Sequence, residues 1–146
     1  MNILFSILMM FALSAPSEAP TGDKNEHVGF EAKLSRVTLK PGATVEVLVF
    51  LTPKEGIHIN TDPSMEFEWN KDRYVHFDST TSLPKDEKTG YLDTSKPVRY
   101  SLTLSGTMPS GKHTVRGNVR YFFCSDSEGW CNRFVQPVEL SFTVIR

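Results

Sequence analysis

The chain lacks the features that mark a membrane protein, a nucleic-acid-binding protein or a domain cross-linked by many disulfides. Its 146 residues include only two cysteines, and 16 basic and 17 acidic side chains give a formal net charge of −1. We therefore expect neither nucleic acid nor anionic lipid as a partner. After Leu13 no apolar run approaches the roughly 20 residues that a membrane-spanning helix needs, so the mature chain is not expected to insert into a membrane.

Motifs of common catalytic sites are also missing. The sequence contains no glycine-rich phosphate loop, no nucleophile elbow and no H-E-x-x-H pattern. Four histidines, at positions 27, 58, 76 and 113, show no ligand spacing, so neither a metal nor a cofactor is expected. With 39% hydrophobic and 23% charged residues, the composition is that of an ordinary globular domain, which can form a normal core without a disulfide.

A targeting segment is indicated at the N-terminus. An apolar run from Ile3 to Leu13 is followed by small residues, and the first basic side chain is Lys24. We expect a signal peptide at 1–19, a linker at 20–28 and one domain at 29–146, with a disordered apolar tail as the alternative for the first segment. The expected location is periplasmic or otherwise exported, where two thiols become bridged unless something reduces them.

The remaining sequence alternates with a period of two, which is typical of β-strands. Strands are expected at 30–34 with 37–39, 44–51, 57–60, 75–77, 98–104, 115–123 and 138–144. The strand at 44–51 is apolar on almost every residue, which predicts a central strand covered on both faces. Turn signals lie at 41–42, 53–56 and 109–111, and no stretch carries a helical apolar stripe. These patterns predict an all-β fold, an immunoglobulin-like antiparallel β-sandwich of seven or eight strands.

Both cysteines lie close together in the stretch YFFCSDSEGWCNRF. The strands on either side predict a hairpin with the loop 125–130, in which Cys124 faces Cys131 and Phe122 faces Arg133. A bridge there closes only a short loop and contributes roughly 2.5 kcal/mol by the chain-entropy argument, which is little for a stabilising disulfide. Thiol-disulfide exchange with another protein and a local structural staple are the two interpretations.

The two cysteines have different sequence surroundings. Cys124 follows an aromatic run and should be the better buried sulfur, whereas Cys131 precedes polar residues and should be more open. Asp126 and Glu128 in the loop disfavour a thiolate unless an arginine at 120 or 133 compensates. We therefore expect these cysteines to receive attack from a partner's activated thiolate rather than to initiate exchange.

From about Phe30 to Arg146 the chain resembles the N-terminal periplasmic domain of the thiol:disulfide interchange protein DsbD family. The resemblance rests on KPGATVEVLVFL followed by EGIHIN, on PKDEKTGYLDTSKPVRYSLTL, and on VRYFFCSDSEGWC followed by VQPVELSFTV. It implies an immunoglobulin-like fold and an electron relay similar to a thiol-disulfide oxidoreductase, with Cys124 and Cys131 as the redox pair. It further implies that Cys131 forms the mixed disulfide. The implied partners are thioredoxin-like periplasmic proteins, including those of cytochrome c biogenesis, or a membrane electron-transfer protein.

The same family covers its cysteines with a cap loop. Asp86 and Glu87 match the acidic residues of that loop, and Lys88 stands where its shielding aromatic is expected, which leaves Tyr91 as the candidate cap. Without the resemblance, the segment 85–94 is an ordinary charged surface loop.

His58 and Asn60 align with positions beside the family's site, although a lone histidine at a strand end is more often a plain structural residue. Because neither an electron conduit nor a thioredoxin-like domain is included in these 146 residues, separate proteins are expected to reduce the pair. The alternative is a non-redox extracytoplasmic binding or assembly module, in which the hairpin disulfide is structural.

Overall fold

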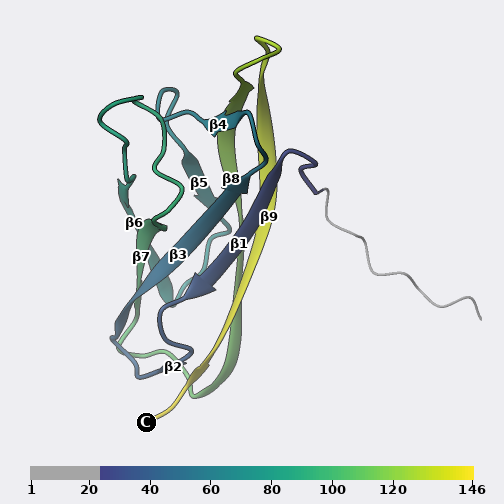
Figure 1. Cartoon of the computed structure of the whole chain (residues 1–146). Coiled ribbons are helices and arrows are strands. Elements are labelled where there is room, and N and C mark those ends of the chain that lie inside the picture. Colours follow the sequence, from purple (N-terminus) through teal and green to yellow (C-terminus); the bar gives the residue numbers. More distant parts are fainter. Residues whose placement is uncertain (1–23) are drawn as a thin grey trace, which may run out of the picture.

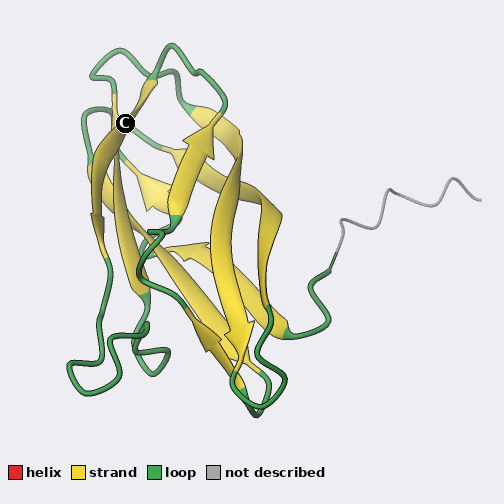
Figure 2. Ribbon diagram, turned by 90° about the horizontal axis from the view of Figure 1, so that it is seen from above, coloured by secondary structure: helices red, strands yellow, loops and turns green. Residues whose placement is uncertain are grey.

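The computed structural model describes residues 24–146, so the signal peptide expected at 1–19 and residues 20–23 of the expected linker lie outside the described residues (Figure 1). Within 24–146 there are nine strands and no helix, and hence no helix that could cross a membrane (Figure 2). The strands are β1 (Val28–Leu34), β2 (Thr38–Leu39), β3 (Thr44–Pro53), β4 (Ile57–Ile59), β5 (Glu66–Trp69), β6 (Val75–Ser82), β7 (Val98–Leu104), β8 (Gly111–Ser125) and β9 (Cys131–Val144).

Two sheets face each other. One has the order β1-β3-β7-β6, and the other has the order β2-β9-β8-β4, with β5 also paired to β8. All pairings are antiparallel except the short parallel pairing of β2 with β9. This arrangement is that of an immunoglobulin-like sandwich, in which the strands conventionally named A, B, E and D oppose G, F and C. The predicted fold class is confirmed.

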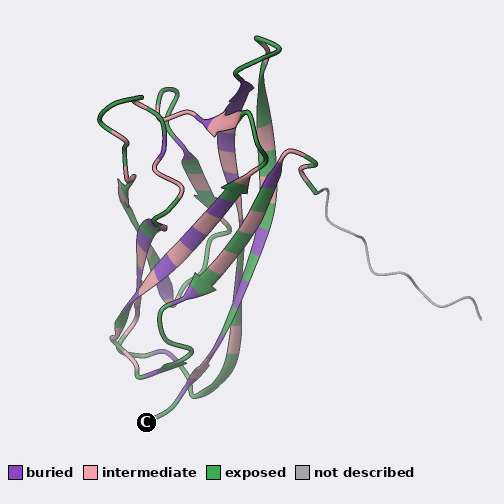
Figure 3. Ribbon diagram, viewed as in Figure 1, coloured by how far each residue is buried: buried purple, intermediate pink, exposed green. Residues whose placement is uncertain are grey.

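Alternating burial along the strands produces the core between the sheets (Figure 3). In β7, Val98, Tyr100, Leu102 and Leu104 are buried while the residues between them are exposed or half-buried. Successive side chains of a strand point to opposite faces, so one face of each sheet supplies the core. Full burial of a residue such as Leu102 contributes about 1.5–3 kcal/mol.

Strand β3 differs from its prediction. It is central in its sheet, as expected, but only one of its faces is buried. The other face carries Glu46, which pairs with Arg99 at 2.9 Å, and Phe50, whose ring lies 4.9 Å from the Lys33 ammonium. An apolar side chain on this outer face is covered by a neighbour's long side chain rather than by another layer of structure.

The strand β5 falls in a region expected to be irregular. Its Phe67 and Trp69 pack against the core, and Trp69 lies over β8 at Gly117. A Cβ at Gly117 would come within 2.5 Å of the Glu68 carbonyl oxygen and 2.8 Å of the Trp69 ring. The absence of a side chain at Gly117 is therefore what lets β5 approach β8.

Residues at the end of the expected linker pack on the domain. The Asn25 side-chain amide donates to the Tyr121 hydroxyl at 3.0 Å, and the His27 ring lies 5.0 Å from that of Trp130. Strand β1 then begins at Val28, which is 2% exposed. The ordered domain thus includes residues 25–28.

Candidate functional site

The cysteine hairpin forms the tip of β8 and β9, at the end of the sandwich opposite the C-terminus (Figure 1). Cys124 pairs with Cys131 and Phe122 with Arg133, as predicted. The next pair, Ser125 and Trp130, is joined by a backbone hydrogen bond of 2.9 Å, so the cysteines occupy the neighbouring non-hydrogen-bonded position, where facing side chains are closest. They form a disulfide with an S–S distance of 2.02 Å and a Cα–Cα distance of 4.0 Å.

The two half-cystines differ in exposure, which confirms the prediction made from their neighbours. Cys124 is 6% exposed, whereas Cys131 is exposed. The difference follows from strand order, because Cys124 lies on β8 between β9 and β4, while Cys131 begins β9 at the margin of the sheet. One half-cystine is thus open to solvent and the other is shielded by the domain.

The exposed cysteine borders an open groove of about 560 Å³. Its walls are formed by Asn60, Pro63, Phe122, Cys131, Asn132 and Arg133. Phe122 and Pro63 make part of this surface apolar, and Arg133 adds a positive charge. A protein segment lying in the groove would therefore reach Cys131 across a mixed apolar and cationic surface.

Strand β4 and the residue that follows it carry two polar side chains on the Cys124 face of the sheet. His58 is the direct cross-strand partner of Cys124, and Asn60 Oδ1 lies 3.4 Å from Cys124 Sγ. A disulfide sulfur carries no hydrogen, but after reduction the Cys124 thiol can donate to this oxygen. Asn60 is therefore placed to favour the protonated thiol of Cys124.

The ring of His58 is held from two sides. Its Nδ1 lies 2.5 Å from Oδ1 of Asp126 in the hairpin loop, and its plane stacks on Tyr91 at a centroid distance of 3.6 Å and an angle of 11°. Only 16% of the His58 side chain is exposed. The histidine thus connects the hairpin loop, the loop that contains Tyr91, and the strand beside Cys124.

Residues of the expected cap loop have different roles. The Asp86 carboxylate accepts hydrogen bonds from the backbone N–H groups of Lys88 at 2.8 Å and Thr89 at 3.2 Å, so it organises its own turn. Glu87 and Lys88 are exposed. Tyr91 is the member of this set that reaches His58.

Backbone hydrogen bonds fix the Tyr91 loop against the end of β4. The Thr61 hydroxyl donates to the Gly90 carbonyl at 2.7 Å, and the Leu92 N–H donates to the Ile59 carbonyl at 2.9 Å. Because these contacts lie on either side of Tyr91, the position of its ring is set by the fold.

The carboxylates of the hairpin loop are both engaged. Asp126 contacts His58, and Glu128 accepts a hydrogen bond from Trp130 Nε1 at 2.6 Å. Arg120 pairs with Glu66, so Arg133 is the arginine that lines the groove with Cys131. The repulsion expected between the loop acids and a thiolate is thereby reduced, and a cation lies on the Cys131 side.

The aromatic residues Phe67, Trp69 and Trp130 are partly buried and pack against the core. Trp69 stacks on Phe77 at 4.7 Å, and Phe67 stacks on Tyr100 at 4.7 Å. Trp130 lies edge-on to the Phe123 ring, beneath the hairpin tip. These rings anchor β5 and the hairpin to the core.

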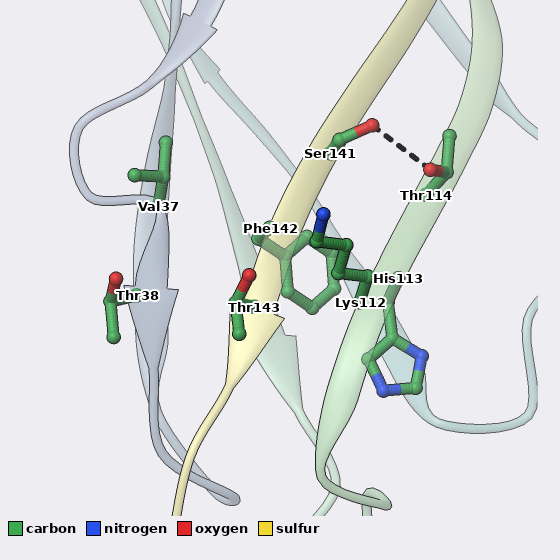
Figure 4. Close-up of a pocket in the computed structure, with 8 residues that line it drawn as sticks. All are labelled: Val37, Thr38, Lys112, His113, Thr114, Ser141, Phe142 and Thr143. Atoms are coloured by element: carbon green, nitrogen blue, oxygen red, sulfur yellow. Dashed lines mark hydrogen bonds between the residues drawn. The ribbon is translucent and has the colours of Figure 1, made fainter.

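A second hollow of about 300 Å³ lies at the other end of the hairpin, where β2 meets β9 (Figure 4). The Thr114 and Ser141 hydroxyls are hydrogen-bonded to each other at 2.9 Å, and the His113 Nε2–H donates to the Pro109 carbonyl at 2.8 Å. Its lining has no cysteine or carboxylate. Within residues 24–146 there is also no cluster of three His, Cys, Asp or Glu side chains that could hold a metal. The cysteine hairpin is therefore the better candidate site.

Sequence reasoning did not find the link between His58 and Asp126. These residues are 68 positions apart, and only the register of β4 on β8 brings them together. A histidine in a short strand and an aspartate in a hairpin loop carry no local signal of their pairing.

No protein family and no curated protein matches the chain. Among solved structures, it is similar to a type I cohesin (OlpA) in complex with a dockerin from Clostridium thermocellum, with a TM-score of 0.42, 16% identity, and coverage of 80% of this chain and 99% of the other. It is also similar to AggA, the major subunit of aggregative adherence fimbriae type I from Escherichia coli, with a TM-score of 0.40, 10% identity, and coverage of 85% and 99%. At these identities and scores, the likenesses carry no statement about activity.

Proposed function

We propose that the chain is a thiol-disulfide relay that exchanges electrons with thioredoxin-like partners through Cys124 and Cys131. The observation that carries the proposal is the unequal exposure of the two half-cystines in one bridge. A structural staple needs no such difference, whereas exchange needs one sulfur open to attack and one that stays within the domain.

The chemistry assigns a role to each sulfur. A partner thiolate attacks Cys131 Sγ, the bond between Cys131 and Cys124 breaks, and its electron pair remains on Cys124 Sγ. The partner's second thiol, as thiolate, then attacks its own sulfur in the mixed disulfide and releases Cys131, so two electrons pass to this chain. Arg133 beside the groove favours the thiolate released at Cys131.

The proposed cellular setting is the periplasm or another exported compartment. A bridged cysteine pair fits an oxidising compartment, and the N-terminal apolar run has the pattern of a signal peptide. The resemblance to the DsbD N-terminal domain places the chain, in this proposal, between a membrane electron-transfer protein and periplasmic thioredoxin-like acceptors. Tyr91 takes the position of the cap residue in this scheme.

The reduction potential of the pair tests the proposal. A value near those of thioredoxin-like proteins, between about −270 and −120 mV, is expected for a relay, whereas structural disulfides usually lie below about −300 mV. A value in the structural range favours the alternative, a non-redox binding or assembly module.

Trapping experiments test the roles of the two sulfurs. Cys124→Ser removes the resolving thiol and should accumulate a mixed disulfide between Cys131 and a periplasmic thioredoxin-like protein. The matched variant Cys131→Ser should trap little, because its remaining sulfur is buried. Capture by Cys124 alone would reverse the assigned roles, and capture by neither would count against the relay.

A further inference from the structure

We infer that His58, held by Asp126, gives and takes the proton of the Cys124 sulfur during disulfide exchange. This inference rests on the proposed relay and adds a residue to its chemistry. It starts from the observation that the buried half-cystine, rather than the exposed one, has a histidine as its direct cross-strand partner.

Because Cys124 is buried, its sulfur needs a proton donor from the domain, whereas the exposed Cys131 does not. When the disulfide opens, the electron pair on Cys124 forms a thiolate in a site that is 6% exposed. A charge with so little access to water is unfavourable unless it is neutralised or paired. Water can protonate the exposed Cys131, but Cys124 requires a donor supplied by the domain.

The position and orientation of His58 meet that need. Directly opposed antiparallel residues have Cβ atoms about 4.5–5.5 Å apart and project from the same face, so the side chain of His58 begins beside that of Cys124. Asp126 occupies Nδ1, and Tyr91 covers a face of the ring. Nε2 is the nitrogen that remains for exchange, because the carboxylate at Nδ1 holds the ring in one orientation.

The proton balance can be written for both directions. During reduction, the partner thiolate attacks Cys131, Cys124 leaves with the electron pair, and protonated His58 transfers its Nε2 proton to Cys124 Sγ. During oxidation, neutral His58 takes the Cys124 thiol proton, and the resulting thiolate attacks Cys131 within the mixed disulfide and expels the partner's thiolate. Asn60 Oδ1, at 3.4 Å, accepts a hydrogen bond from the thiol between these steps.

Few other charged or titratable groups compete for the ring. On the hairpin loop, Glu128 is hydrogen-bonded to Trp130, and on the Tyr91 loop the Asp86 carboxylate binds backbone N–H groups of its own turn. Asp126 and Tyr91 contact the ring directly, which places one carboxylate and one phenol against it. Lys54 and Glu55, in the turn before β4, are the remaining nearby charges along the chain.

His58→Gln is the most direct test. Glutamine can keep a hydrogen bond to Asp126 but cannot transfer a proton, and His113→Gln at the far end of the hairpin is the matched control. We measure the rate at which dithiothreitol reduces the disulfide of the mature chain as a function of pH, with the melting temperature measured alongside. His58→Gln should reduce roughly tenfold more slowly at neutral pH and lose one titration step from its pH profile, while His113→Gln should keep the wild-type profile.

A second variant separates chemistry from packing. Asp126→Asn preserves a polar partner at Nδ1 and should keep the titration step, so loss of the step in His58→Gln alone assigns it to the imidazole rather than to packing of the hairpin loop. A purely structural His58 would leave the shape of the profile unchanged in His58→Gln. A wild-type pH profile in His58→Gln overturns the inference while leaving the relay intact. Failure of the relay is seen separately, as a wild-type potential in the range of structural disulfides together with no trapped partner.

Discussion

Reducing the disulfide between Cys124 and Cys131 should leave the domain folded, with a loss of stability that can be worked out from the loop that it closes. The cysteines are 7 positions apart in the sequence. For a loop this small, the chain-entropy argument gives a contribution of about 2.5 kcal/mol, against a typical free energy of unfolding of about 5–15 kcal/mol for a single domain.

The tip of the hairpin also has contacts that do not depend on the bridge. Ser125 donates its N–H to the Trp130 carbonyl at 2.9 Å and accepts the N–H of Gly129 on its carbonyl oxygen at 3.1 Å. Its hydroxyl accepts the Glu128 N–H at 3.2 Å. These hydrogen bonds should keep the turn formed after reduction, so the two thiols remain close enough to be oxidised again.

Urea unfolding of the oxidised and reduced chain measures the difference. With a slope of about 1–3 kcal/mol/M, a change of 2.5 kcal/mol moves the midpoint by roughly 1–2 M while the transition stays cooperative. Because the disulfide stabilises the folded state by this amount, folding stabilises the disulfide equally. The reduction potential of the folded chain should therefore be more negative than that of the urea-unfolded chain by about 50 mV. Loss of the cooperative transition on reduction would refute this reasoning and identify the bridge as a structural staple.

Three further outcomes are expected. Gly117→Ala should destabilise the fold by about 3 kcal/mol, measured by urea unfolding, because the new methyl group would clash with β5 at Trp69; a loss below about 0.5 kcal/mol would show that β5 moves away freely. Tyr91→Ala should speed reduction by dithiothreitol with a nearly unchanged melting temperature, and an unchanged rate would remove Tyr91 from the site. Burial raises the pKa of Tyr121 despite the hydrogen bond from Asn25. The contribution of the neutral phenol to the free energy of unfolding is therefore complete below the ordinary tyrosine pKa near 10, and it is lost as the pH rises above that value. Tyr121→Phe should lessen this loss of stability at alkaline pH, measured as the difference between unfolding midpoints at about pH 8 and pH 11.

The strand pattern and the cysteine hairpin could be predicted because both depend on local signals. A period of two along 98–104 and 138–144 corresponds to β7 and part of β9, with the expected faces buried. The register of the hairpin followed from the short loop between its strands, and the relative burial of Cys124 and Cys131 followed from their neighbours. Each of these features is encoded within a few residues of where it appears.

The parts that were not predicted depend on contacts between distant segments. Strand β5 required a close approach at Gly117, which no local pattern in residues 66–69 reveals. The outer face of β3 was expected to be covered by another layer of structure, because an apolar side chain such as Phe50 suggests burial. In the structure, the side chain of a lysine covers Phe50 instead. Asp86 matched an acidic position of the cap loop by alignment, but its hydrogen bonds show that the carboxylate holds its own turn.

The margin of β9 next to Cys131 bears on self-association. Within the described part of the chain, 24–146, no strand pairs with the outer edge of β9 from Cys131 to Leu140, and such an edge is a template for another copy of the chain. Backbone groups at two positions of that edge are unavailable: the Arg133 N–H donates to Asn132 Oδ1 at 2.8 Å, Pro137 has no N–H, and the Pro137 carbonyl accepts from Gln136 Nε2 at 3.2 Å. A second molecule aligned along β9 would lose hydrogen bonds at these positions, which disfavours the pairing that would bring two Cys131 sulfurs together. The exposed sulfur can thus be offered to a partner with a reduced tendency to cross-link the protein to itself.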